Sequence, residues 1–286
     1  MTKFISEISS NHNGSLSRSL KMIKLSSSLG FDIVKFQLFK IDKLFAKEIL
    51  NKSKNHRDRK KWELKEKFIP ILAKECKKNK IKFCVTPFYL EAVDIIKPYV
   101  HYIKIASYEL LWKDLLIKCA KTKKPIIIST GMANMKEVIN ATEILKKNGA
   151  KKIIILHCVS NYPAKIKSLN LSAINTIRKK TKLSTGWSDH SNNPLIVSRA
   201  IEKFKSSYVE LHLDLEGKGY EFKSGHCWLP SKAKNLIFYI KNREKIDGNG
   251  IKIPIKSEKN ERNFRADPID GLRPIKKFRK KYEKEF

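Results

Sequence analysis

Residues 125–131 read PIIISTG and residues 152–158 read KIIILHC. Both are apolar runs that end in polar residues, and a strand buried on both faces reads as such a run. Six more stretches repeat this pattern at fairly even spacing along the chain. The eight strands that we expect are Lys3–Ser9, Asp32–Leu38, Lys82–Pro87, Tyr102–Ser107, Pro125–Thr130, Lys152–Cys158, Leu183–Ser188 and Tyr208–Asp214.

The segments between these strands carry the apolar spacing of three and four residues that is typical of helices. Regular alternation of strand and helix indicates a parallel sheet with right-handed crossovers. We therefore predict an α/β fold, a (β/α)8 TIM barrel with a short C-terminal extension; an open doubly wound sheet is the alternative. The helices expected are Leu16–Leu29, Trp62–Lys78, Met135–Asn148, Ser191–Phe204 and Ser231–Ile246, with residues 39–61 as a long charged loop.

The 286 residues divide into two parts in this interpretation. Residues 1–246 form the barrel, which typically takes about 250 residues, and residues 247–286 form a basic tail. The N-terminus lacks a signal-peptide pattern, and no apolar run reaches the roughly 18–20 residues of a membrane span. The five cysteines form no C-x-x-C pair, which argues against disulfides and structural zinc. We expect a cytoplasmic protein without a membrane partner.

The formal net charge of +33 would suit a nucleic-acid or polysaccharide binder. Lysine, however, greatly outnumbers arginine, and the basic residues are spread along helical stretches such as Lys77–Lys80. No nucleic-acid module is recognisable. We interpret the charge as compositional bias on solvated helix faces and expect no nucleic-acid partner, although attraction of anionic substrates remains open.

Two histidines end neighbouring strands of the predicted barrel. His190 follows the seventh strand and His212 lies in the eighth, and Glu210 points to the same side as His212 because side chains alternate along a strand. One histidine at a barrel end is more often structural, but two imidazoles with a carboxylate suit Mn, Fe, Zn or Mg. The sequence therefore predicts a divalent metal site at the barrel mouth.

Two lysines lie inside otherwise apolar strands. Lys35 and Lys104 are costly to bury unless each meets an anion. With hydroxyls from Ser107, Ser129 and Ser160 they predict a phosphate or carboxylate pocket at the same rim. Ion pairing with a structural glutamate, such as Glu7 or Glu109, is the alternative for either lysine.

Eight short motifs follow the strands in order. They are Glu7 with Asn11–Gly14, Val34–Gln37, Thr86–Phe88, Lys104–Ser107 with Glu109, Ser129–Met132, Leu156–Cys158 with Asn161–Pro163, Ser188–His190, and Glu210–His212. Together, over about residues 3–215, they resemble the sialic acid synthase family: bacterial N-acetylneuraminate synthases and their legionaminic, pseudaminic and spore-coat relatives. Each motif is weak alone, whereas eight in sequence are specific.

The resemblance implies a transferase that condenses phosphoenolpyruvate (PEP) with the open aldehyde form of an N-acylated amino sugar. The products are a sialic-acid-like 2-keto sugar acid and phosphate. It further implies Mn²⁺ or Mg²⁺ on His190 and His212, and leaves a homodimer open. The residues implied in PEP binding are Lys35, Lys104, Thr86, Ser107, Ser129 and Ser160.

Catalytic and sugar-facing residues are implied in the same way. Glu109 would stabilise the cation at C2 of PEP or activate water, with Glu7 and Glu210 as further catalytic carboxylates facing the sugar. Tyr162 would also face the sugar. Asn161 and His157 would shape the site.

The sequence departs from the family in three places. Val159 precedes Ser160 where a hydroxyl residue is often found, a minor loss of one donor. After His212 the usual Pro-Gly-Pro-Asp loop is replaced, so its sugar-binding aspartate is missing, and Glu221 or His226 is the candidate substitute. We also expect no C-terminal antifreeze-like domain, the part that supplies an arginine to the sugar pocket in typical members. Arg265 and Arg273 of the tail are the candidates for that role.

Two other functions remain open from the sequence alone. A different barrel lyase or aldolase would use Lys104 as a Schiff-base nucleophile. A non-catalytic basic binding protein would show steep salt dependence towards nucleic acid, but it would give the convergent Lys, His, Glu and Ser residues no role.

Overall fold

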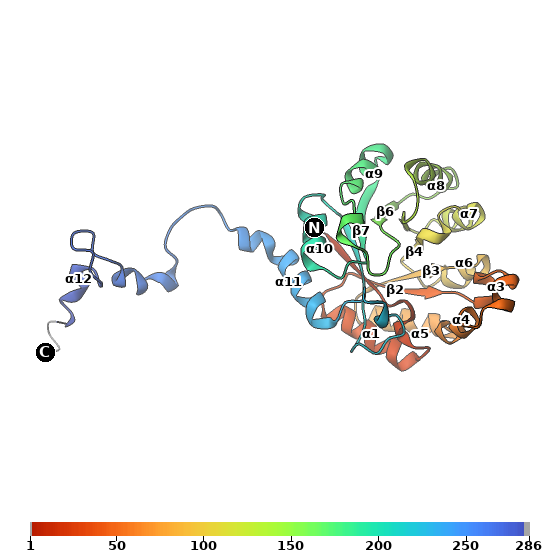
Figure 1. Ribbon diagram of the computed structural model, residues 1–286, viewed down its shortest axis with the longest axis horizontal. Coiled ribbons are helices and arrows are strands. Elements are labelled where there is room, and N and C mark those ends of the chain that lie inside the picture. The colour runs from red at the N-terminus through yellow and green to blue at the C-terminus, as the bar shows by residue number, and fades with distance from the viewer. Residues whose placement is uncertain (1, 283–286) are drawn as a thin grey trace. The chain divides into compact units, whose positions relative to one another are not determined.

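The computed structural model, in which residues 2–282 are described, contains a closed barrel of eight parallel strands. The strands pair in chain order, and β8 pairs with β1 to close the cylinder. Figure 1 shows the strands at the centre of the barrel unit. This confirms the predicted TIM barrel and excludes the open sheet. The strands are β1 Lys3–Glu7, β2 Ile33–Leu38, β3 Lys82–Pro87, β4 Tyr102–Ile105, β5 Ile126–Ser129, β6 Ile153–Cys158, β7 Ser184–Asp189 and β8 Tyr208–His212.

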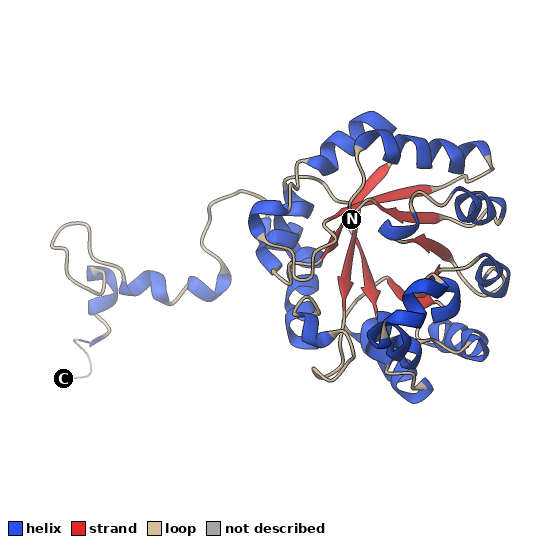
Figure 2. Cartoon of the chain, turned by 45° about the vertical axis from the view of Figure 1, so that its right-hand side comes forward, coloured by secondary structure: helices blue, strands red, loops and turns tan. Residues whose placement is uncertain are grey.

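Helices surround the strands on the outside, as Figure 2 shows. They include short helices in residues 39–61, where the sequence predicted only a loop. The helices are α1 Leu16–Ser28, α2 Ile41–Leu44, α3 Lys47–Lys52, α4 Lys54–Arg57, α5 Ile69–Lys78, α6 Leu90–Ile96, α7 Lys113–Lys121, α8 Met135–Lys147, α9 Ala173–Thr181, α10 Pro194–Glu202, α11 Pro230–Asp247 and α12 Lys276–Arg279.

Several element ends differ from the sequence prediction. The first and fourth strands stop two residues early, because Ser9–His12 and Ser107–Glu109 turn into 3₁₀ helices at the rim. The helix expected from Trp62 begins only at Ile69, since Pro70 is tolerated in the first turn of a helix and not inside it.

The barrel interior is layered along its axis. Side chains two residues apart on a strand point the same way, so an apolar layer continues upward into a polar one. The apolar layer consists of Ile5, Ile33, Cys84, Tyr102, Ile127, Ile154, Leu156 and Tyr208. Two residues further along their strands stand Glu7, Lys35, Thr86, Lys104, Ser129 and Glu210. The strand register therefore carries polar groups to the C-terminal mouth.

The chain forms two compact units, Met1–Asn242 and Arg243–Phe286. Within the second unit, Asp270 accepts hydrogen bonds from both terminal nitrogens of Arg279 at 2.5 and 2.8 Å, and the rings of Phe264 and Phe278 pack 5.2 Å apart. These contacts give the tail local order of its own.

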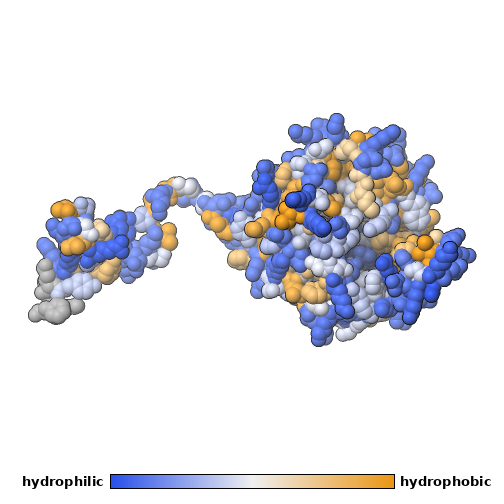
Figure 3. Space-filling view, in the orientation of Figure 1, coloured by the Kyte–Doolittle hydropathy of each residue, from blue (hydrophilic) through white to orange (hydrophobic). Residues whose placement is uncertain are grey.

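The face of the barrel unit seen in Figure 3 is bordered by hydrophilic residues. Among the described residues, no helix combines the length and the apolar character needed to cross a bilayer.

Candidate active site

A cavity of about 670 Å³ opens at the C-terminal mouth of the barrel. Most of the residues predicted from the sequence line it, although they come from strands far apart in the chain. The lysines and glutamates are Glu7, Lys35, Lys104, Glu109, Glu210 and Glu221; the others are Ser107, Ser129, Tyr162, His190, His212 and His226. The predicted convergence of strand ends on one site is thus present.

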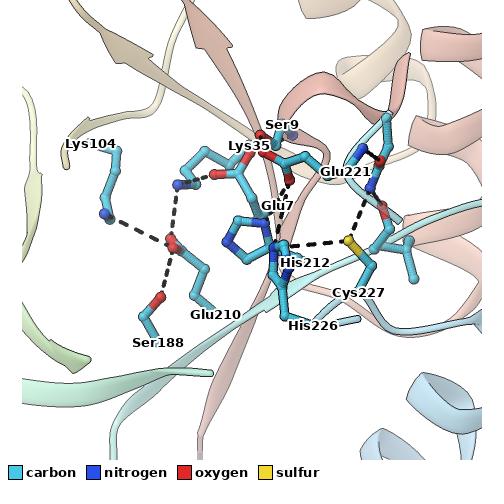
Figure 4. A network of polar contacts seen from close by, with 12 residues as sticks. Glu7, Ser9, Lys35, Lys104, Ser188, Glu210, His212, Glu221, His226 and Cys227 are labelled. Carbon is cyan, nitrogen blue, oxygen red and sulfur yellow. Dashed lines mark hydrogen bonds and ion pairs between the residues drawn. The ribbon is translucent and has the colours of Figure 1, made fainter. Parts of the chain in front are cut away.

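Lys35 is a buried cation held between two carboxylates (Figure 4). Its Nζ contacts Glu7 Oε2 and lies 3.2 Å from Glu210 Oε2. Burial alone would lower the pKa of Lys35, but the two carboxylates outweigh burial and raise it. The sequence alternative, in which Lys35 pairs with Glu7, is therefore realised, and Glu210 adds a second partner.

Lys104 is buried with a weaker set of partners. Its Nζ is 4.0 Å from Glu210 Oε1 and donates at 3.4 Å to the carbonyl of Ile105. Burial lowers the pKa of Lys104, and Glu210 offsets that effect only in part. Of the two inward lysines, Lys104 is the one that lacks a close anion.

The carboxylates of the cavity differ in their protonation. Burial opposes ionisation of Glu210, yet Lys104 and Lys35 hold its pKa at about 2. Burial dominates for the other two: it raises the pKa of Glu7 in spite of Lys35, and it raises the pKa of Glu109 to about 7 in spite of Lys104. Glu109 is therefore the carboxylate that can gain or lose a proton near neutral pH.

Three hydroxyl groups predicted to bind PEP are buried without partners. Thr86 Oγ1, Ser129 Oγ and Ser160 Oγ make no hydrogen bond to any described residue. Ser107 Oγ contacts Cys158 Sγ at 3.2 Å and accepts from the Gly131 amide at 3.0 Å. Buried hydroxyls are normally satisfied, so these orphaned hydroxyls fit a site that binds a ligand.

Glycine is required at position 131 because there is no room for a side chain, and not because of its φ angle. A Cβ on Gly131 would lie 2.2 Å from Ser160 Oγ and 2.9 Å from Ser107 Oγ. Only glycine lets the backbone approach both hydroxyls so closely. Ser160 itself lines a neighbouring cavity of about 590 Å³, and Thr86 is part of neither lining.

Three imidazoles and a phenol ring cluster on the other side of the cavity. His190 and His212 have ring centroids 5.2 Å apart, and His226 joins them at 5.8 and 4.6 Å respectively. The Tyr162 ring lies 4.4 Å from His190. Burial lowers the pKa of both His190 and His226 to about 3, so both are neutral at pH 7 and offer lone pairs.

Glu221 approaches this cluster from the loop after β8. Its Oε2 is 3.1 Å from His212 Nδ1, and its Oε1 accepts from Ser9 Oγ. Burial opposes ionisation of Glu221, but His212 outweighs burial and holds the pKa at about 2. His212, Glu221 and His226 each offer one ligand atom, all within 4.8 Å of one another, and so could hold a metal ion.

The loop at residues 213–229 is fixed by the Asn-His-Asn-Gly motif of residues 11–14. Asn11 accepts from the Glu221 amide at 2.9 Å and donates to the Leu213 carbonyl at 3.1 Å, while Asn13 accepts from the Tyr220 amide at 3.0 Å. Arg18 pairs with Asp214 at 2.9 Å. A side chain at Gly219 would strike Asn11 Oδ1, at 2.2 Å.

An aromatic wall that the sequence did not reveal completes the cavity. Phe45, Arg59 and Trp62 reach it from residues 39–62, and Tyr220 faces them from the loop after β8. The rings of Trp62 and Tyr220 stack at 6.1 Å, and the Arg59 guanidinium lies 5.4 Å from Trp62. The signal available in the sequence was the aromatic residues spaced through an otherwise charged segment.

The remaining predicted residues lie elsewhere. Asn161 is exposed and does not line the cavity. His157 contacts the Leu169 carbonyl at 2.9 Å and packs on Trp187, so it supports the segment after β6. Arg265 and Arg273 belong to the second compact unit, where Arg265 donates to the Arg262 carbonyl at 3.0 Å.

Comparison with known proteins identifies the family. A model of the NeuB family matches residues 22–252. The N,N'-diacetyllegionaminic acid synthase of Campylobacter jejuni is 35% identical over 291 residues, which cover 96% of this chain and 86% of that protein. The enzyme of the same name from Legionella pneumophila is 31% identical over 274 residues, covering 90% and 77% respectively.

A solved structure supports the same assignment. The crystal structure of an N-acetylneuraminic acid (sialic acid) synthetase from Leptospira borgpetersenii, in complex with citrate, superposes with a TM-score of 0.78 at 29% identity. The match covers 91% of this chain and 90% of that one. Sequence, fold and the placement of the motifs agree, and the chain belongs to the NeuB family.

Proposed function

We propose that the protein is a transferase that condenses PEP with the open aldehyde form of an N-acylated amino sugar. The observation that carries the proposal is the cavity at the barrel mouth, where the underpaired ammonium of Lys104 and the partnerless hydroxyl of Ser129 are both part of the lining; the buried hydroxyls of Thr86 and Ser160 also lack partners. A small molecule with phosphate and carboxylate oxygens would supply the missing acceptors and counter-charge. The synthases to which the chain is similar suggest the reaction class.

PEP would lie along this pocket. Lys104 and Lys35 would neutralise it, with hydroxyl donors from Thr86, Ser107, Ser129 and Ser160. Because Lys35 already has two carboxylate partners, the larger gain in electrostatic energy on binding falls to Lys104. Glu210, which faces both lysines, favours the charged form of each ammonium group before the substrate arrives.

The reaction forms one C–C bond and breaks one C–O bond. C3 of PEP attacks the aldehyde carbon, and positive charge develops at C2 of PEP. Water adds to C2, and phosphate leaves with the oxygen that had joined it to C2. The aldehyde oxygen becomes a hydroxyl by taking one of the two protons that the incoming water gives up. Glu109, near Lys104 and with a pKa of about 7, would take a proton of that water.

His190 and His212 would hold the divalent ion, Mn²⁺ or Mg²⁺ by resemblance. The fit is good: His190 Nδ1 contacts the Val159 carbonyl at 2.7 Å, which leaves Nε2 free with its lone pair, as in many metal sites. The ion would act as a Lewis acid towards the aldehyde oxygen. Glu7 and Glu210 would orient the sugar beside it.

The acceptor sugar would occupy the outer cavity. Tyr162 lines it, whereas Asn161, which the sequence also predicts as an acceptor ligand, does not. Arg265 and Arg273 are the further acceptor ligands predicted from the sequence. The sequence also predicts Glu221 in this group, but its carboxylate contacts Ser9 and His212. The aromatic wall of Phe45, Trp62 and Tyr220 would contact the sugar's apolar face.

One observation favours a second candidate, an aldolase that uses Lys104. A lowered pKa is what a Schiff-base lysine needs. Borohydride added with substrate would trap a covalent adduct on Lys104 in that case and leave the protein unmodified in a PEP synthase.

The test is phosphate release from PEP with Mn²⁺ or Mg²⁺, screened across N-acetylated mono- and diamino sugars and their phosphates. The proposal expects release that requires both the sugar and the ion. Absence of acceptor-dependent release with the whole panel would count against it.

A further inference from the structure

The loop at residues 213–229 places two potential ligands, Glu221 and His226, against the pair of histidines at the barrel mouth. We propose that Glu221 and His226 bind the ion directly, so that this chain holds it with three imidazoles and one carboxylate: His190, His212, Glu221 and His226. The proposal rests on the metal site proposed above but not on the condensation reaction. It gives the substituted loop a chemical role other than sugar binding.

The ligand atoms are spaced as a single ion requires. His212 Nδ1 is 3.1 Å and His226 Nε2 is 3.8 Å from Glu221 Oε2, and one ligand atom each from His212, Glu221 and His226 lies within 4.8 Å of the other two. Ligand atoms on one ion with bonds of about 2.1 Å are separated by about 3.0 Å at 90° and cannot exceed about 4.2 Å. Both measured separations lie in that range.

The ring positions agree for the two pairs that include His212. Two imidazoles on one ion have centroids about 4.6 Å apart at 90° and about 5.3 Å apart at the tetrahedral angle, given Zn–N bonds of about 2.1 Å. His190–His212 at 5.2 Å and His212–His226 at 4.6 Å fall in that range, whereas His190–His226 at 5.8 Å requires a wider angle at the ion. Each pair is tilted by 68° to 87°, so the rings converge edge to face rather than stack.

The loop is built to hold these two residues in place. The Glu221 amide is fixed by Asn11, and the backbone following His226 is bound to β8 through the Trp228 amide, which donates to the His212 carbonyl at 2.6 Å. His226 is buried, and its Nδ1 has no hydrogen-bond partner among the described residues. Figure 4 shows His212, Glu221 and His226 converging from β8 and the loop.

A narrower role for Glu221 is the main alternative. Its carboxylate would then accept a hydrogen bond from His212 Nδ1–H and orient the ring, while the ion bound elsewhere on that ring. Glu221→Gln separates the two roles, because the amide oxygen still accepts that hydrogen bond but is a poor metal ligand.

The donor set also predicts which ion is preferred. Three imidazoles favour Zn²⁺, Fe²⁺ or Mn²⁺ over Mg²⁺, which prefers oxygen ligands and keeps its waters. The Mg²⁺ alternative drawn from the resemblance is therefore the weaker one for this chain.

Calorimetric titration of the chelator-stripped full chain, without PEP or sugar, tests the proposal. For wild type we expect one equivalent of Zn²⁺ bound more tightly than Mn²⁺, and Mg²⁺ bound far more weakly. Glu221→Gln and His226→Ala should each weaken Zn²⁺ binding by at least about 100-fold. Loss of a residue that only hydrogen-bonds a metal ligand typically weakens binding by roughly 10- to 100-fold. His101→Ala, a histidine at the opposite end of β4, is the matched control and should bind as wild type.

Thermal melting shows whether the variants are folded. Without metal the variants should melt like wild type, and with Zn²⁺ only wild type and His101→Ala should gain stability. Wild-type affinity in either Glu221→Gln or His226→Ala, or no Zn²⁺ binding by wild type, would overturn the four-residue centre. Acceptor-dependent phosphate release is measured in a separate assay. If wild type binds Zn²⁺ as predicted but releases no phosphate, the proposed condensation is rejected and the four-residue metal site is not.

Discussion

At the scale of single residues, Lys35 and Lys104 both face Glu210, but Lys35 is paired more closely. Lys35 has two close glutamate partners, whereas Lys104 has Glu210 at 4.0 Å. A charge-assisted hydrogen bond contributes about 1.5–3 kcal/mol. Lys104→Met should therefore weaken PEP binding roughly 10- to 150-fold, measured by calorimetry.

The control for this prediction is Lys121→Met, an exposed lysine at the end of α7, which should leave PEP affinity unchanged. Wild-type PEP affinity in Lys104→Met would show that Lys104 does not meet the substrate.

Glu109 should set the acidic limb of the pH profile. Burial raises its pKa to about 7, so the carboxylate form that accepts a proton is lost as the pH falls through 7. We expect kcat/KM to rise with pH up to about 7 and then level. Glu109→Gln should remove this limb and lower kcat by about 10²- to 10⁴-fold; a limb that survives the substitution would assign it to another group.

The same pKa has a consequence for stability. Because the folded-state pKa exceeds the unfolded value of 4.5, the folded state binds more protons between pH 4.5 and 7. Its contribution to the free energy of unfolding is therefore present at low pH and declines as the pH rises through that window. Denaturant titrations of wild type and Glu109→Gln across the window should diverge in this direction.

Some site residues were predictable because strand periodicity alone orients them. Lys35, Lys104 and Glu210 each stand two residues beyond an inward apolar residue, so their convergence follows from the barrel. The approach of His226 to His212 was not predictable in this way, because it depends on the path of a loop with no period. Asn161 shows the converse: it lies in a matching motif, yet its side chain is exposed.

At the scale of elements, the loop after β8 depends on the first β–α connection. Asn11 bonds both the Glu221 amide and the Leu213 carbonyl, and leaving such buried groups unpaired costs about 1–3 kcal/mol each. Asn11→Ala should therefore reduce the free energy of unfolding by several kcal/mol and speed hydrogen exchange in residues 213–229.

Asn148→Ala is the matched control, since Asn148 bonds only its own helix, at Ile144. Equal hydrogen-exchange rates for the 213–229 segment in wild type and Asn11→Ala would contradict the docking role of Asn11.

Among the elements, the strands were the most predictable and residues 39–62 the least. Eight apolar runs leave little choice of register in a closed sheet. The helices α2, α3 and α4 are four to six residues long, too short to show a helical period, and the cavity wall they carry was missed for that reason.

At the scale of the whole molecule, the predicted role of the tail arginines can be tested without assuming where the tail lies. Arg265→Ala/Arg273→Ala should raise the KM for the acceptor sugar and leave PEP affinity unchanged if either arginine contacts the sugar. An unchanged acceptor KM would remove both residues from the site.

The central claim is C–O cleavage of PEP coupled to C–C bond formation, and oxygen labelling tests it most directly. PEP carrying ¹⁸O in the C–O–P bridge is incubated with the protein, Mn²⁺ and a productive acceptor sugar, and the products are analysed by mass spectrometry. We predict that all of the label leaves in phosphate and that the new 2-keto acid carries none. Label retained at C2 of the product would mean P–O cleavage and would contradict the proposed mechanism.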